Sequence, residues 1–227
     1  MNDSEFVAPL LLGICCVAIW LVLFYKIAFR PSTARNRAKP FTFPRTDAFP
    51  QGLTIRQYHD SDYPACLVIY ESNSEFLPPM PELFLQTIEE HPAGFLVAVL
   101  HGKIVACGGV TMLPEKGYAL LWMGLVHRAH HRQKIGTLML LVRLALVEDG
   151  AAVATLETTA KTHSFYESFG FCRNSKSEKR YLGDHSHFGM SRFLPKYPGN
   201  PIRQYLRKTG VTFAFDLDES DFTISHQ

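Results

Sequence analysis

The sequence has few cysteines, and none of them form a Cys-x-x-Cys pair. The five are Cys15, Cys16, Cys66, Cys107 and Cys172, an odd and scattered set. This argues against a disulfide framework and a zinc knuckle, and it suits a reducing compartment. Internal repeats and low-complexity tracts are also missing. The formal net charge is only +2 over 227 residues, which gives no reason to expect a nucleic-acid partner. The length suits one domain of ordinary size with appendages.

Charged residues are absent from Phe6 to Tyr25, a stretch rich in Leu, Ile and Val. As a helix this stretch can cross a hydrocarbon core of roughly 30 Å. A signal peptide would begin with basic residues, whereas Asp3 and Glu5 precede the apolar run, and no small-x-small cleavage site follows it. A buried core helix would rarely be so uniformly apolar. We therefore predict a transmembrane helix at residues 6–29, after an extracytoplasmic N-terminus at residues 1–5.

Basic residues follow the predicted span, before the first acidic residue, Asp47. They are Arg30, Arg35, Arg37, Lys39 and Arg45. The positive-inside rule then predicts a single-pass membrane protein whose remaining chain faces the cytoplasm. Residues 30–52 also contain four prolines and little apolar periodicity. They are predicted to be a linker that sets a soluble domain off the membrane and is attracted to anionic headgroups.

Residues 53–195 have the mixed pattern of an α/β domain. Strands are expected at 53–58, 94–100, 104–113, 118–126, 151–156 and 187–194, and helices at 60–71, 82–91, 135–147 and 159–169. The order predicts a mixed sheet with helices on both faces and one parallel junction in its middle. Residues 196–227 form a C-terminal extension with a basic helical piece and an alternating segment. It is open whether that extension is an edge strand, a lid or a loose tail.

The segment Leu125–Thr137 leaves a strand, crosses a mostly basic loop and enters a strongly apolar helix. Such a junction directs backbone N–H groups, the positive end of the helix dipole and cationic side chains at one point. This arrangement is suited to a phosphate or pyrophosphate.

Three features together resemble the GNAT superfamily of acyl-CoA-dependent N-acyltransferases. In the loop, Val126 and Gly136 match the family pattern Val-x-x-x-x-Gln/Arg-x-x-Gly-x-Gly/Ala, whereas His131 replaces Gln or Arg and Lys134 replaces the first glycine. The segment 165–171, Phe-Tyr-Glu-Ser-Phe-Gly-Phe, resembles the family's Tyr-Glu-x-x-Gly-Phe motif. Thr159 stands where the family usually has asparagine. The order of elements is the third feature.

The resemblance implies a site for acetyl-CoA. In the family, the loop amides and the helix N-terminus hold the CoA pyrophosphate, and the strand before the loop offers main-chain groups to the pantetheine arm. Carried over to this sequence, the binding residues are Leu125, Val126, His131, Arg132, Gln133, Lys134, Ile135, Gly136, Thr137 and Thr159. The alternative is that the loop is only a solvated basic turn.

The resemblance also places Tyr166 near the thioester sulfur, where a phenol can protonate the departing thiolate. The alternative is that Tyr166 packs its helix against the sheet with its hydroxyl bonded to backbone. The amine must lose a proton to a base, and Glu157 is the first candidate because alternation would turn it toward the same site. His127, Glu71, Glu75 or a water chain remain alternatives.

The His-x-x-His-His sequence at 127–131 invites a metal site, but zinc needs three or four converging ligands, and no fourth ligand is near in sequence. No metal is predicted. The sequence thus predicts a membrane-anchored N-acetyltransferase that moves an acetyl group from acetyl-CoA to an amine, on a small molecule or a protein, by direct attack in a ternary complex. The rival hypotheses are a non-catalytic acyl-CoA-binding or scaffolding protein, and transfer of a longer acyl chain.

Overall fold

The computed structural model describes residues 41–217, apart from residues 76, 78–80, 114–116, 175–179, 183–184 and 195–200. The predicted N-terminus, the predicted span at residues 6–29 and the first part of the linker lie outside these residues. Within the described part of the chain, no helix combines the length and apolar character needed to cross a membrane.

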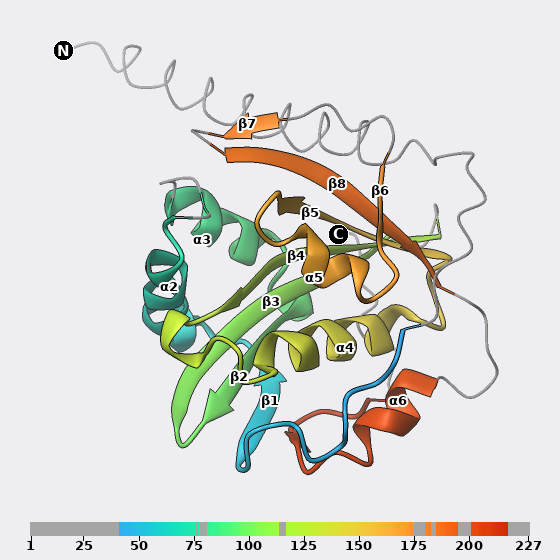
Figure 1. The fold of residues 1–227 in the computed structure, drawn as a ribbon. Helices are drawn as coiled ribbons and strands as arrows, with labels where there is room; N and C mark the ends of the chain where they lie inside the picture. Colours follow the sequence, from blue (N-terminus) through green and yellow to red (C-terminus); the bar gives the residue numbers. More distant parts are fainter. Residues whose placement is uncertain are drawn as a thin grey trace.

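A mixed sheet of nine strands organises the described residues (Figure 1). Its path runs β6-β8-β5-β4-β3-β2-β1-β9, and β7 pairs with β8. The bounds are β1 Leu53–Gln57, β2 Phe95–Leu100, β3 Lys103–Leu113, β4 Tyr118–Val126, β5 Val153–Thr159, β6 Cys172–Arg173, β7 Arg180–Leu182, β8 His185–Phe193 and β9 Thr212–Phe213. Neighbours are antiparallel except β4 with β5 and β1 with β9. The predicted parallel junction in the middle of the sheet is therefore confirmed.

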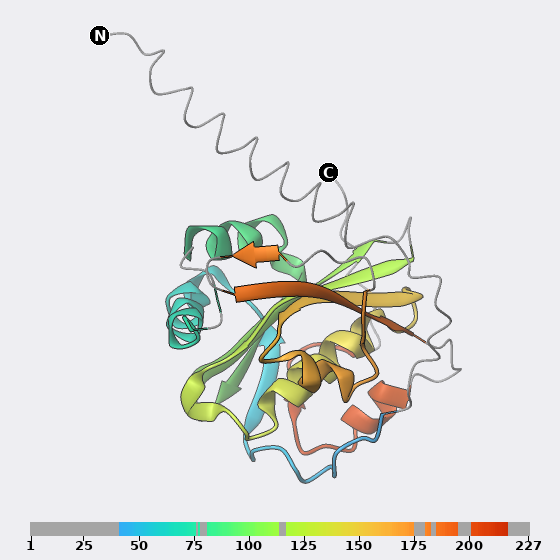
Figure 2. The ribbon, with the colours of Figure 1, turned by 45° about the horizontal axis from the view of Figure 1, so that its top comes forward.

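Helices cover both faces of the sheet, as predicted (Figure 2). On one face, α2 (Tyr63–Ser72) and α3 (Pro81–Glu90) enclose an aromatic core that contains Phe84, Phe95 and Trp122. On the other face, α4 (Ile135–Val147) packs against β3 and β4, and α6 (Pro201–Leu206) packs against α4. Twelve of the thirteen residues of α4 are buried, which explains why its sequence is apolar on every side.

The strand β4 and the helix α4 begin and end at the predicted residues. The next helix is shorter than predicted: α5 covers only His163–Glu167, not residues 159–169. The reason is that β5 continues to Thr159, which pairs with His187 of β8. In the C-terminal extension, β9 pairs in parallel with β1, so this part of the extension is an added edge strand. The short strands β6 and β7 had no counterpart in the sequence pattern.

Residues 41–52 are irregular, as a linker should be, but they lie against the domain. The ring of Phe41 is 5.5 Å from that of Phe169, and the guanidinium carbon of Arg192 lies 4.5 Å from the centre of the Phe41 ring. The ring of Phe43 stacks on Tyr205 of α6 at 4.5 Å. We call residues 41–50 the aromatic strap. It joins the N-terminal part of the chain to the face that carries α5 and α6.

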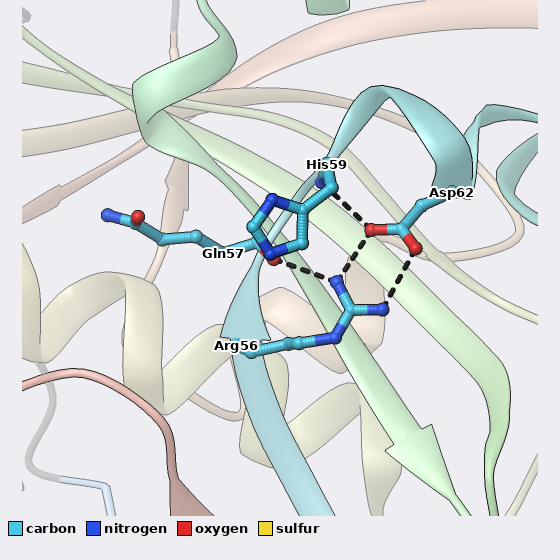
Figure 3. Close-up of polar contacts among 4 residues, drawn as sticks. All are labelled: Arg56, Gln57, His59 and Asp62. Carbon is cyan, nitrogen blue, oxygen red and sulfur yellow. Dashed lines mark hydrogen bonds and ion pairs between the residues drawn. The ribbon is translucent and has the colours of Figure 1, made fainter.

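A two-pronged ion pair fixes the turn from β1 into α2 (Figure 3). The guanidinium of Arg56 donates to both carboxylate oxygens of Asp62, at 2.6 and 2.8 Å. The backbone N–H of His59 donates to the same carboxylate at 2.8 Å. Asp62 is buried and Arg56 is only partly exposed. The hydrogen bonds from Arg56, helped by that from His59, lower the pKa of Asp62 despite its burial.

We expect Asp62→Asn to lower the free energy of unfolding by about 1–3 kcal/mol, because it leaves Arg56 without its charged acceptor. A lowered carboxyl pKa stabilises the fold above the unfolded-state pKa of about 3.9, and this contribution is lost as the pH falls through the folded-state value. The difference from wild type should therefore be full at pH 7 and should shrink below about pH 4. Urea unfolding at pH 7 and pH 3 measures the loss of stability and its dependence on pH. Asp47→Asn, in an exposed pair with Arg45, is the matched control and should change stability little. An equal loss in the two variants would contradict the assignment.

Candidate functional site

The parallel strands β4 and β5 pair over only three residues each. Residues Tyr118–Leu120 are in register with Val153–Thr155, and the pairing ends there. β4 continues for six more residues and β5 for four, so the two strands separate in the middle of the sheet. Gly124 is exposed although its strand is central in the sheet order. We call this divergence the splay. It leaves main-chain groups of two central strands without a strand partner between them.

A β-bulge in β4 lies beside the splay. Met123 and Gly124 together stand opposite Gly108 of β3, because the register shifts between Cys107 and Gly109. Met123 has a φ of +45°, which is unusual for a residue other than glycine. An extra residue reverses which face the following side chains address. Leu125 accordingly turns toward the aromatic core of α2 and α3.

The basic loop after β4 has a backbone shaped for an anion. Arg132 and Lys134 adopt left-handed conformations, with φ of +65° and +63°, and α4 begins directly afterwards at Ile135. Left-handed residues alternating with others make a concave array of N–H groups, and the first N–H groups of a helix have no partner within it. The side chains of Arg132, Gln133 and Lys134 are exposed around this array.

Hydrogen bonds tie the loop to the ends of β4 and α2. The carbonyl oxygen of Val126 accepts from His131 Nε2 at 2.9 Å and from Asn73 Nδ2 at 3.0 Å. The backbone N–H of Arg128 donates to Ser72 Oγ at 3.3 Å. Both lone pairs of the Val126 carbonyl are thus used to hold the loop. The side chain of His131, which stands at the family's Gln/Arg position, therefore holds the loop to the end of β4.

Tyr166 lies on α5, on the same side of the sheet as α4. Its ring packs edge-on against Phe165 and Phe171, at 5.0 and 5.9 Å between centroids. Burial raises the pKa of the Tyr166 hydroxyl, and the positive charge of Arg143 acts in the opposite direction. Within the described residues this hydroxyl forms no hydrogen bond, so the backbone bond expected of a purely packing tyrosine is absent there.

Glu157 lies on β5 beyond the residues that pair with β4, pairs with Gly189 of β8 and is half-buried. Its neighbour Leu156 belongs to the core that contains α4. Because successive side chains of a strand alternate, Glu157 points to the opposite face, toward α2 and α3. Glu157 and Tyr166 therefore lie on opposite faces of the sheet.

A model of the acetyltransferase (GNAT) family matches residues 53–171, just over half of the chain. The chain belongs to this family. The match begins at the first residue of β1 and ends just after α5, so it contains the splay, the bulge, the loop and Tyr166. The prediction that the protein is an acetyltransferase is confirmed.

Solved structures share the fold of this acetyltransferase at low sequence identity. The ribosomal-protein-S18-alanine N-acetyltransferase from Escherichia coli is 21% identical, with a TM-score of 0.55 over 65% of this chain and 97% of that one. Ard1 from Thermoplasma volcanium is 19% identical, with a TM-score of 0.56 over 63% and 99%. The N-acetylglutamate synthase from Neisseria gonorrhoeae, solved with coenzyme A and N-acetyl-glutamate, is 18% identical, with a TM-score of 0.51 over 65% and 36%. No curated protein matches the sequence.

The structure brings most of the sequence-predicted residues of this acetyltransferase to one end of the splay. Thr159 is an exception in its contacts: its hydroxyl lies 3.0 Å from that of Thr162, so it closes the turn between β5 and α5. Two features were missed by sequence reasoning, the bulge and Arg143. A signal for Arg143 existed, because it is the only charged residue in Ile135–Val147. Among the described residues, no group of three or more His, Cys, Asp or Glu is arranged to hold a metal ion.

Lys134→Gly should stabilise the protein by about 0.5–1 kcal/mol and preserve or tighten CoA binding, because glycine takes a φ of +63° without steric cost. Lys134→Ala keeps the strain and removes the charge, so it separates the two effects. Calorimetric titration measures the affinity for CoA, and thermal melting measures the stability. His101→Gly, at a φ of +50° in the turn between β2 and β3, is the matched control and should leave CoA binding unchanged. Loss of CoA binding in Lys134→Gly would show that the loop is wrongly aligned with the family pattern.

Proposed function

We propose that the protein transfers an acetyl group from acetyl-CoA to an amine, by direct attack of the amine on the thioester in a ternary complex. The observation that carries this proposal is the splay between β4 and β5, with the N–H-rich loop at its end. Tyr166 packs against the core on the α4 side of the same sheet. The names of the similar structures, which include N-acetyltransferases, support an amine as the acceptor.

The residues of the loop fit the anionic part of acetyl-CoA. The backbone N–H groups from Arg132 to Thr137 would hold the pyrophosphate, with the side chains of Arg132 and Lys134 adding positive charge. Lys134 adopts the left-handed conformation that glycine takes most easily, so its backbone is one that the family's glycine could also adopt. The unpaired edge of β4 beyond Leu120 would receive the pantetheine arm as an additional strand.

In the proposed reaction, the base and the acid would act from opposite faces of the sheet. Glu157, directly or through water, would take the proton from the amine on the face of α2 and α3. When the C–S bond breaks, the electron pair leaves on sulfur, and Tyr166 would give its proton to the thiolate from the other face.

Direct attack is favoured by the state of the nearby cysteines. Cys107, the cysteine beside the bulge, is fully buried next to Cys66. A hydrogen bond with Cys66 and burial raise the pKa of the Cys107 thiol well above its usual value. A neutral buried thiol is a poor nucleophile, so a covalent acetyl-enzyme through Cys107 is disfavoured.

The test is a thiol-release assay of the full chain in detergent over a panel of amines, paired with equilibrium binding of acetyl-CoA. Turnover with at least one amine is expected. Binding of acetyl-CoA without turnover would favour the non-catalytic rival. Faster thiol release from longer acyl-CoAs would show that the transferred acyl group is longer than acetyl.

Tyr166→Phe is expected to lower turnover by about tenfold or more while CoA affinity holds, because only the proton donor is removed. The phenylalanine ring keeps the contacts with Phe165 and Phe171. Steady-state kinetics and CoA titration measure the two quantities. Tyr205→Phe makes the same chemical change on α6, away from the splay, and should leave turnover unchanged. Full turnover in Tyr166→Phe would remove Tyr166 from the mechanism.

We further propose that the chain is anchored in a membrane with the acetyltransferase domain on the cytoplasmic side, so that the acceptor lies at or near the membrane. The uncharged stretch from Phe6 to Tyr25 and the basic residues after it support this.

Deletion of residues 1–40 should move the protein from the membrane fraction to the soluble fraction and leave turnover with a soluble amine unchanged. The cut ends before the aromatic strap, whose Phe41 and Phe43 pack on the domain. Deletion of residues 1–50 is the matched comparison and should also lower the melting temperature, since it removes those contacts. Fractionation shows whether the protein is in the membrane or the soluble fraction, and thermal melting measures the melting temperature. Retention of the shorter deletion in the membrane fraction would contradict anchoring by this stretch.

A further inference from the structure

A single charge is buried in the long apolar helix α4. Arg143, in the middle of this helix, is 3% exposed. Its Nε donates to the carbonyl oxygen of Met139 at 3.0 Å, and its Nη1 lies 3.4 and 3.3 Å from the carbonyl oxygens of Gly109 and Trp122. Within the described residues no carboxylate forms an ion pair with this guanidinium. Burial of a charge that no opposite charge balances is costly, so the bonds to the two strands need an explanation.

Two glycines leave the space that the guanidinium occupies. A Cβ on Gly124 would lie 2.6 Å from Arg143 Nη2, and a Cβ on Gly108 would lie 3.2 Å from Nη1. The same Cβ on Gly108 would lie 3.1 Å from the Cα of Gly124, so the two glycines face each other across β3 and β4. Glycine at both positions is therefore what allows the guanidinium to reach the main chain of the two strands.

The guanidinium lies at the register shift that forms the bulge. Gly109 of β3 pairs with Trp122 of β4, and this is the last pair along β4 before the shift. A bulge interrupts the ladder of main-chain hydrogen bonds, and a buried carbonyl needs a donor. Arginine suits two carbonyls at once, because its planar guanidinium carries five N–H donors and stays charged. Arg143 therefore joins β3 to β4 where their own pairing is interrupted.

The bulge is also part of the splay. β4 and β5 stop pairing at Leu120 and Thr155, and the bulge at Met123 and Gly124 follows on β4. Gly124 is exposed whereas Arg143 is buried, so the guanidinium lies behind the main chain that is open at the splay. The proposed function places the pantetheine arm along this edge. A group that fixes the bulge therefore fixes the main-chain groups that the arm would meet.

We propose that Arg143 is a positioning residue that holds the bulge of β4 in the shape that receives the pantetheine arm of acetyl-CoA. The inference rests on the proposed function, because that function places the arm on β4. Arg143 acts through the main chain, by its bonds to Gly109 and Trp122. A strand edge that is already ordered binds a flexible arm more tightly, because less of the chain has to be ordered on binding.

Arg143→Met removes the hydrogen-bond donors and keeps an unbranched apolar chain. Two ligands separate the arm from the rest of CoA: CoA itself and 3′-phospho-ADP, which is CoA without its pantetheine arm. We expect the affinity for CoA to fall about tenfold, the effect of weakening one or two main-chain hydrogen bonds. The affinity for 3′-phospho-ADP should be unchanged, because this ligand would contact only the loop. Calorimetric titration measures both affinities. Equal losses for the two ligands, or no loss for either, would overturn the proposal.

Arg203→Met is the matched control. Arg203 is also a buried arginine, and its Nε donates to the carbonyl oxygen of Ala145 at 3.2 Å, but it lies on α6. This variant should lose stability and keep both affinities. A selective loss of CoA affinity as large as that in Arg143→Met would show that the effect is not specific to the bulge, and it would overturn the proposal.

A compensating pair of substitutions separates hydrogen bonding from packing. In Gly124→Ala the added methyl takes the place of Arg143 Nη2, so the melting temperature and the affinity for CoA should both fall. When Arg143→Met is added, the methyl occupies the space that the guanidinium has left, so the melting temperature should rise above that of Gly124→Ala. The affinity for CoA should stay as low as in Arg143→Met alone. Recovery of the affinity together with the melting temperature would show that Arg143 only fills space.

Arg143→Lys is the second variant, for use if Arg143→Met does not fold. Lysine keeps the charge, but its ammonium group lacks the planar array of donors that spans two carbonyls. The ratio of the CoA affinity to the 3′-phospho-ADP affinity should still fall. An unchanged ratio would overturn the proposal.

Hydrogen exchange of the unliganded full chain separates this inference from the proposed function. Peptides from β4 should exchange faster in Arg143→Met than in Arg203→Met, because the bulge is no longer held. If the wild-type chain binds no CoA, the proposed function fails, and faster exchange still shows that Arg143 holds the bulge. Unchanged exchange of β4 in an enzyme that binds CoA would overturn the inference and leave the proposed function standing.

Discussion

Three residue pairs join β4 to β5, and the site depends on the end of that pairing. A continuous parallel ladder would have used the main-chain groups of both strands and covered Gly124. Because the ladder stops at Leu120 and Thr155, an edge exists in the interior of the sheet, where edges are normally absent. The bulge at Met123 and Gly124 keeps β4 paired to β3 while it turns away from β5. Helix α4 packs against β4, and the loop that leads into α4 lies at the end of the splay that follows β4.

Sequence patterns predicted those elements whose ends are set locally. The strand β4 lies between a glycine turn and a polar loop, and α4 is a long apolar run, so both were predicted to the residue. Elements whose ends are set by distant partners were not. Thr159 was assigned to a helix and Thr158 to no element, but threonine suits a strand, and pairing with Phe188 and His187 of β8 extends β5 through both. Strands of two or three residues, such as β6, carry no periodicity to detect.

The candidate site also contains some residues that the sequence could predict and others that it could not. The loop and Tyr166 were proposed from the sequence because their residues lie in short segments that resemble a family pattern. Lys134, a departure from that pattern, has the left-handed backbone that glycine adopts most easily, and sequence alone does not show this. Arg143 and the glycines beside it lie far apart in the sequence, and their contact exists only after a helix has packed on a sheet. A charge inside an apolar run was the one available signal.

The aromatic strap links two parts of the molecule that the sequence separates widely. The ring of Phe41 meets Phe169, Phe169 meets Phe165, and Phe165 meets Tyr166, each pair within 5.5 Å between centroids. The rings that pack around the tyrosine are therefore in contact with the start of the aromatic strap. Residue 41 and the tyrosine, far apart in the sequence, thus belong to one continuous stack of packed rings, so a change in the position of residue 41 would alter the surroundings of α5.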